Sequence, residues 1–169
     1  MKFKVDFKDF EKFADRVKML ADQDVEKVSQ KFCEETAKEL VGRLLAKVVE
    51  KTPVGEYGTK EVRFVTKDGK EVNFIAHINK TGGTLQRGWE VGEVIKTGNV
   101  YEVELYNPVH YASYVEYGHR TVPRIDGSRG WVEGRFMLTL SKEELEEEGP
   151  AIIENKLQKF LEEHFNGNA

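Results

Sequence analysis

The chain has 169 residues, 39% of them hydrophobic and 33% charged, and a formal net charge of −4 at neutral pH. This length predicts one compact domain, residues 1–169, and the apolar content is enough for a core and too high for a disordered chain. The negative charge argues against a protein that binds nucleic acid through its phosphates or attaches to an anionic membrane. The single cysteine, Cys33, cannot form an internal disulfide, and no stretch has the roughly 18 apolar residues of a membrane span.

Residues 6–52 are predicted to be helical, because apolar residues recur there at helical spacing. Charges interrupt the apolar residues at the start of the chain, so we predict no signal peptide. An unbroken helix of that length would measure about 60 Å, whereas a compact chain of this size is about 40 Å across. We therefore predict a break at 21–24, with Asp24 capping a long second helix that Pro53 ends. Such a helix leaves apolar surface without a partner inside the chain, which predicts self-association.

Two β-hairpins are predicted next, because the apolar period changes to two. The first, residues 61–78, turns at Asp68-Gly69, a pair typical of a type I′ turn. The second, residues 85–107, turns at 97–99, and its last strand presents apolar residues to one face and glutamates to the other. Between the hairpins, the segment 81–84 lacks the Gly-Lys-Ser/Thr ending of a phosphate-binding loop and is interpreted as a hinge.

The rest of the chain is predicted to hold a short helix at 110–117, ended by Gly118, and a long loop at 118–134. A capping box at Ser141 begins a C-terminal helical region, 141–165, which Gly149-Pro150 would break and which carries a net charge of −5. The predicted fold class is α+β, with long N-terminal helices packed on a small antiparallel β-sheet, an extra hairpin and a C-terminal amphipathic helix.

The most plausible catalytic group is His110, Glu116 and His119, which would make the protein a small metal-dependent hydrolase. Only Glu116 and His119 have a spacing that places two ligands on one helix face, and Gly118 interrupts that helix. A structural role for Glu116, as an acceptor for nearby backbone or Arg120, is therefore preferred. Ser113, Ser128 and Cys33 lack the surroundings of a nucleophile.

The basic loop between Arg120 and Arg135 allows two interpretations. It can contact nucleic acid, but it also holds Asp126 and Glu133, and Trp131 is its one aromatic residue for base stacking. A loop that becomes ordered against a protein partner is the preferred interpretation.

Four segments together point to a family. They are Thr52-Pro53-Val54, Thr81 to Trp89, Asn107 to Arg120, and Gly134 to Leu138. In this order the chain resembles the tail-completion, or head-tail joining, neck protein family of tailed bacteriophages, and most of all its contractile-tail branch in myophages and PBSX-like prophages. It departs from many relatives in the roughly 26 residues inserted before Thr81, which form the first hairpin, and in Gln86, where many relatives have arginine.

The resemblance implies a non-enzymatic virion component of the tail and neck, without cofactor or bound metal and without membrane contact. It implies a homo-oligomer, commonly a ring, between the tail terminator or tail tube and the head connector. DNA would pass through the channel without sequence-specific binding, and assembly would take place in the host cytoplasm.

Two groups of residues are expected to matter. The candidate structural motif, within which Tyr111, Tyr114 and Glu116 would fix the short helix against the sheet, consists of Asn107, Pro108, Tyr111, Tyr114, Glu116 and Gly118. The candidate interaction loop consists of His119, Arg120, Arg124, Arg129, Trp131 and Arg135. The acidic segment 143–148 either lines a channel, where it would repel DNA, or forms a solvated helix face.

Overall fold

A computed structural model describes residues 2–8, 10–11, 14, 24–56, 58–66, 68–77, 80–122 and 127–165. Its elements are β1 (Lys2–Asp6), α2 (Asp24–Lys51), β2 (Thr59–Val65), β3 (Glu71–His77), α3 (Thr84–Arg87), β4 (Glu90–Thr97), β5 (Val100–Tyr106), α4 (Ala112–Tyr117), β6 (Gly118–Arg120), β7 (Trp131–Glu133) and α5 (Met137–Phe165). The predicted α+β class is confirmed. No helix among the described residues combines the length and apolarity needed to cross a membrane.

The main sheet has three antiparallel strands in the order β1-β5-β4. Strand β1 pairs with β5 from Lys2 opposite Glu104 to Asp6 opposite Val100. The prediction that helix begins at residue 6 was therefore wrong, and the strand was missed. The signal for it was present, because apolar and charged residues alternate over Lys2–Asp6 with the period of a strand.

Helix α2 covers the sheet with one apolar stripe. It begins at Asp24 and ends at Lys51, just before Pro53, as predicted. The Thr52 hydroxyl then donates to the carbonyl of Val48 at 2.6 Å. The break was predicted at 21–24, and residues 21–23 lie outside the described residues. The buried stripe consists of Phe32, Cys33, Thr36, Ala37, Leu40, Val41, Leu44 and Val48.

Helix α5 is longer than predicted and is the second cover of that stripe. It begins at Met137, so Ser141 is no cap: its hydroxyl is buried and donates to the carbonyl of Met137 at 2.6 Å. The helix also continues through Pro150, where a break was predicted. Leu138 and Leu145 pack into the same core as α2. The expectation that the stripe of α2 lacks an internal partner was therefore wrong.

Ion pairs line the contact between α2 and α5. Lys47 pairs with Glu144 at 3.3 Å and with Glu148 at 3.0 Å, and Lys51 pairs with Glu144 at 2.9 Å. These cations hold the pKa of the Glu144 carboxyl below its ordinary value, mainly through the hydrogen bond from Lys51. The predicted channel-lining acidic segment is thus partly turned toward lysines of the same chain.

The inserted hairpin is present as β2 and β3, paired from Thr59 opposite His77 to Val65 opposite Glu71. Its turn is not type I′, because Asp68 does not have the positive φ that this type requires and Gly69, at +77°, does. Val62 and Phe74 form a cross-strand pair on one face, opposite to the face with Glu61 and its bonds to Arg63 and Asn73.

The segment before the second hairpin differs from the prediction in two ways. Residues 84–87 form the short helix α3, so the hairpin begins at Glu90 and not at Leu85. The glycines ahead of α3 are packed: a Cβ at Gly82 would collide with the carbonyl of Gly55, and Gly83 is buried with a φ of +89°. Close backbone approach at Gly82 and the positive φ at Gly83, and not a hinge, explain this glycine pair.

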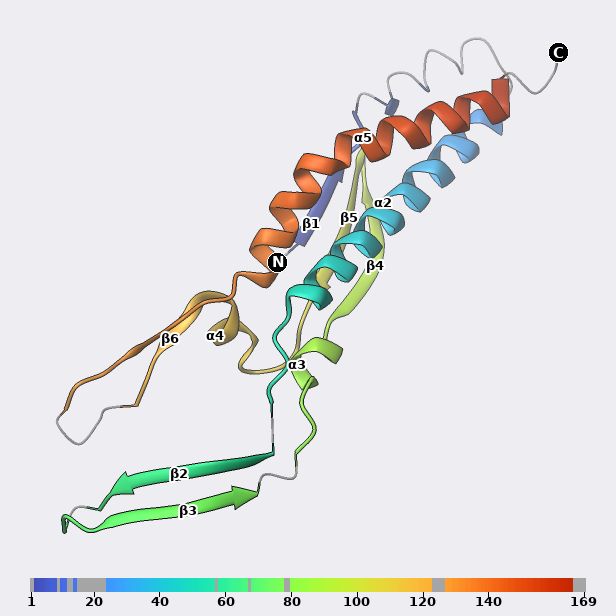
Figure 1. Cartoon of the computed structure of the whole chain (residues 1–169). Helices are drawn as coiled ribbons and strands as arrows, with labels where there is room; N and C mark the ends of the chain where they lie inside the picture. The colour runs from blue at the N-terminus through green and yellow to red at the C-terminus, as the bar shows by residue number, and fades with distance from the viewer. Residues whose placement is uncertain are drawn as a thin grey trace.

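The elements form one body with two projections (Figure 1). Helices α2 and α5 run along one side of the three-stranded sheet, and the hairpin β2–β3 and the strands β6 and β7 extend from the same end of that body. Neither projection packs extensively on the three-stranded sheet. Both therefore extend from the body as separate elements.

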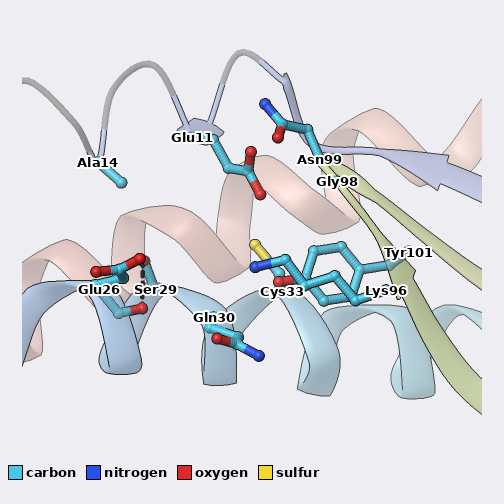
Figure 2. A pocket seen from close by; sticks show the side chains of 10 residues that line it. All are labelled: Glu11, Ala14, Glu26, Ser29, Gln30, Cys33, Lys96, Gly98, Asn99 and Tyr101. Atoms are coloured by element: carbon cyan, nitrogen blue, oxygen red, sulfur yellow. Dashed lines mark hydrogen bonds between the residues drawn. The ribbon is translucent and has the colours of Figure 1, made fainter.

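A small pocket lies between α2 and the turn of β4 and β5, with Cys33 and Tyr101 at its base (Figure 2). Cys33 is only 1% exposed. Burial raises the pKa of its thiol from 9.0 to about 12, and the negative charge of Glu11 adds to the increase. The thiol is therefore a neutral core group at physiological pH.

The pKa of Cys33 makes stability depend on alkaline pH. Between pH 9.0 and about 12 the folded chain keeps a proton that the unfolded chain loses, so this contribution to stability is complete below pH 9.0 and is lost as the pH rises toward 12. We expect the free energy of unfolding, from urea titrations below and above pH 9.0, to fall less steeply with pH in Cys33→Ala than in the wild type. A parallel decrease in both proteins would contradict this.

Candidate protein-interaction surface

The chain after β5 is tied to α3 by Asn107. Its side-chain amide donates to the carbonyl of Leu85 at 2.8 Å, and its side-chain oxygen accepts from the backbone N–H of Val109 at 3.1 Å. Pro108 lies between these contacts and is exposed. Asn107 therefore determines where the following helix begins relative to the sheet.

Helix α4 turns the chain toward α5. Tyr111 is half-buried at its N-terminus, and Gly118, with a φ of +83°, ends it as predicted. Tyr114 is 56% exposed, and its ring contacts the ring of His119. The main contacts of α4 are with β6 and α5. The expected packing against the sheet is thus replaced by a contact of Glu116 with α5 and a contact of Tyr114 with His119 of β6.

Glu116 forms that contact and is buried, with 6% of its surface exposed. One carboxylate oxygen accepts from the backbone N–H of Leu138 at 3.0 Å, and the other accepts from the N–H and the hydroxyl of Thr139 at 2.9 and 2.7 Å. The first N–H groups of a helix have no partner within it, and its N-terminus favours negative charge. Glu116 therefore caps α5 from a different helix.

Backbone hydrogen bonds surround this cap, and the backbone approaches so closely at Gly134 that a side chain does not fit there. Arg135 and Phe136 donate to the carbonyls of Val115 and Glu116 at 2.8 and 3.0 Å. A Cβ at Gly134 would collide with the carbonyl of Glu116. Phe136 has a φ of +50°, which costs a non-glycine residue roughly 1–2 kcal/mol. The contacts around the cap thus stabilise Phe136 in a strained backbone conformation.

Between α4 and α5 the predicted loop 118–134 contains two short paired strands, β6 and β7, and we call residues 118–134 the arm. Arg120 pairs with Trp131 in register. Beyond the strands, three hydrogen bonds join Thr121 and Gly130. The Thr121 N–H donates to the Gly130 carbonyl and the Gly130 N–H donates to the Thr121 hydroxyl, both at 2.9 Å, and that hydroxyl donates to the Gly130 carbonyl at 3.4 Å. The prediction of an irregular loop was therefore wrong over these residues.

The arm and its base expose the predicted interaction residues together with apolar ones. Arg120, Arg129 and the adjacent Arg135 are exposed, and within the described part of the chain they form no ion pair. His119 is half-buried, and Arg124 lies outside the described residues. Exposed apolar side chains of the same region are Tyr114, Tyr117, Val122, Trp131, Val132, Phe136 and Leu140. Four of these, Tyr117, Val132, Phe136 and Leu140, were not among the residues predicted to interact, because their exposure depends on how the arm and α5 are placed.

The geometry does not favour the metal-site alternative. Both carboxylate oxygens of Glu116 accept hydrogen bonds from α5, and the ring of His110 packs edge-on against Tyr111. Among the residues that the structure covers, no three His, Cys, Asp or Glu side chains are placed to hold one ion. The contact of Glu116 with α5 is suited to holding the arm in a fixed position. The exposed side chains of this region include Tyr, Trp and Arg, the residue types that dominate protein interfaces.

Removal of the Glu116 cap should destabilise the fold. Glu116→Gln keeps the shape but loses the charge and one acceptor, and we expect a loss of about 1–2 kcal/mol in the free energy of unfolding, with a larger loss for Glu116→Ala. Urea unfolding measures this, with Glu147→Gln, an exposed position of α5, as the control. If Glu116→Gln unfolds like the control, the cap contributes nothing.

One comparison with known proteins finds a relative. The family model described as "Bacteriophage HK97-gp10, putative tail-component" matches residues 11–118, more than half of the chain. No curated protein and no solved structure shows a significant match. The matched residues include α2, the hairpin of β4 and β5, and α4, whereas β7 and α5 follow them. The chain therefore belongs to the HK97-gp10-like family of bacteriophage tail components.

Proposed function

We propose that this phage tail component works in the neck, where it completes the tail and joins it to the head. In this proposal the chain acts as one structural unit, assembled as a homo-oligomeric ring around the channel through which DNA passes without sequence-specific binding. The observation that carries the proposal is the arm: exposed aromatic and arginine side chains that Glu116 and α5 hold at one end of the body.

The partners in this proposal are the tail terminator or tail tube on one side and the head connector on the other. Assembly takes place in the host cytoplasm, and the finished protein is part of the virion. Protein partners fit the composition of the arm, because Trp, Tyr and Arg are the residues that most often carry binding energy at protein interfaces. The net charge of −4 supports a channel component to which DNA does not adhere.

A structural role, without catalysis, is part of the proposal. It is supported by the use of the most reactive groups for packing: Glu116 caps a helix, and Cys33 is a buried thiol with a raised pKa. A protein that acts by shape needs rigid supports for exposed surfaces, and this chain provides one at the base of the arm.

Excision of the outer part of the arm tests the docking role. Thr121 and Gly130 are hydrogen-bonded to each other, so replacement of residues 122–129 by a two-residue Asn-Gly turn should leave the rest of the fold in place. We expect a protein with the circular dichroism and melting temperature of the wild type that no longer joins heads to tails. Joining at the wild-type level would show that the arm is not the docking element.

Particles produced without the gene test the neck role itself. We expect electron micrographs of separate, unjoined heads and tails, because the surface between them is missing. Supply of the intact gene in trans should restore joined particles and is the control. Joined particles in the absence of the protein would refute the proposed function.

A further inference from the structure

We propose that the arm of one copy binds the acidic edge of the sheet of a second copy. We call acidic edge the exposed surface around β4 and the end of β5, with Glu90, Glu93 and Glu104 and the large side chains of Ile95 and Tyr106. The inference rests on the proposed function, since it names the first partner of the arm within the ring.

The arm and its base carry positive charge in an otherwise acidic chain. Residues 118–135 contain four arginines against Asp126 and Glu133, so this segment has a net charge of +2 within a chain whose total is −4. Arg120 and Arg129 are exposed and have no ionic partner in the described residues. Positive charge that is not neutralised within the chain favours an acidic partner.

The acidic edge supplies the complementary charge. Glu93 and Glu104 are exposed and form no ion pair with any residue that the structure describes. Glu90 accepts a hydrogen bond from the Tyr106 hydroxyl at 2.7 Å. That bond is the main cause of the raised pKa of Tyr106, and the negative charge of Glu104 adds to it, as expected for a surface of negative potential.

The two surfaces also match in their apolar residues. The acidic edge exposes Ile95 to 61% and Tyr106 to 38%, and the arm exposes Trp131 to 54% and Val122 to 84%. In addition, β4 is an outer strand of the sheet, and its pairing with β5 is interrupted between Val91 and Val94. An outer strand leaves backbone N–H and C=O groups without partners, which a second chain can satisfy.

Complementary charge on two separate surfaces of the same chain favours a second copy as the partner. The arm extends away from the sheet of its own chain (Figure 1), and the main contacts of β6 and β7 are with each other and with α4. In the proposal, the arm of one copy contacts the acidic edge of the next copy. Because arm and edge are different surfaces, the contact is head-to-tail, and its repetition gives a ring if the rotation closes.

A charge exchange tests the pairing in the full-length protein. The arm-reversed variant carries Arg120→Glu and Arg129→Glu, and the edge-reversed variant carries Glu93→Arg and Glu104→Arg. All four positions are exposed, so the melting temperature should not change. A matched control carries Lys38→Glu and Glu147→Arg at exposed positions of α2 and α5.

Sedimentation at low salt, up to millimolar protein, gives the readout. We expect the wild type and the control to self-associate, each reversed variant to associate about tenfold or more weakly, and a chain with all four reversals to recover. Added salt should weaken the wild-type contact. The inference would be overturned if the wild type stayed monomeric or if the reversals did not weaken self-association. It would also be overturned if only one of the two reversed variants associated more weakly, or if the chain with all four reversals did not regain association.

The joining of heads to tails separates this inference from the proposed function. If the reversed variants self-associate normally while particles still need the protein for joining, the neck role stands and the arm contact is wrong. If the charge exchange behaves as expected but joining does not need the protein, the contact stands and the neck role is wrong.

Discussion

Coverage of the apolar stripe of α2 is the constraint on which the rest of the structure depends. The stripe runs through Leu40, Leu44 and Val48, which are almost completely buried. Tyr101, Val103 and Leu105 of β5 cover it from the sheet, and Leu138 and Leu145 cover it from α5. A helix of 28 residues has more apolar surface than a three-stranded sheet can bury, so the position of α5 follows from the need for a second cover.

The position of α5 in turn determines how the candidate interaction surface, the arm, is attached to the body. Its first turn lies where the carboxylate of Glu116 can accept from two backbone N–H groups, and this contact joins α4 to the core. The arm leaves and returns within a few residues of that contact. The close backbone approach at Gly134 and the positive φ of Phe136 belong to the same junction. A surface held in this way loses little conformational freedom when a partner binds, which favours affinity.

Ion pairs join the two long helices, whereas the arm and the acidic edge keep charges that are not paired within the described residues. Lys47, Lys51 and Lys156 pair with glutamates across the contact between α2 and α5. The arginines of the arm and the glutamates around β4 are left exposed at separate places. A chain with positive charge on one surface and negative charge on another suits head-to-tail assembly, whereas a uniformly acidic chain would repel its copies.

Local patterns in the sequence were sufficient to determine the α+β class, helix α2 with its end before Pro53, both hairpins and the end of α4 at Gly118, because each depends on neighbouring residues. The family resemblance was also carried by local motifs, and the match over residues 11–118 agrees with it. The alternation over Lys2–Asp6 was a local signal for a strand, but only the tertiary structure supplied its partner β5, which lies about a hundred residues away. The same holds for α5, which begins at Met137 and passes Pro150 because a cap from another helix and the core of α2 outweigh the local signals at Ser141 and Gly149. The role of Glu116 is likewise a consequence of contacts between distant segments, and no spacing within the chain specifies such contacts.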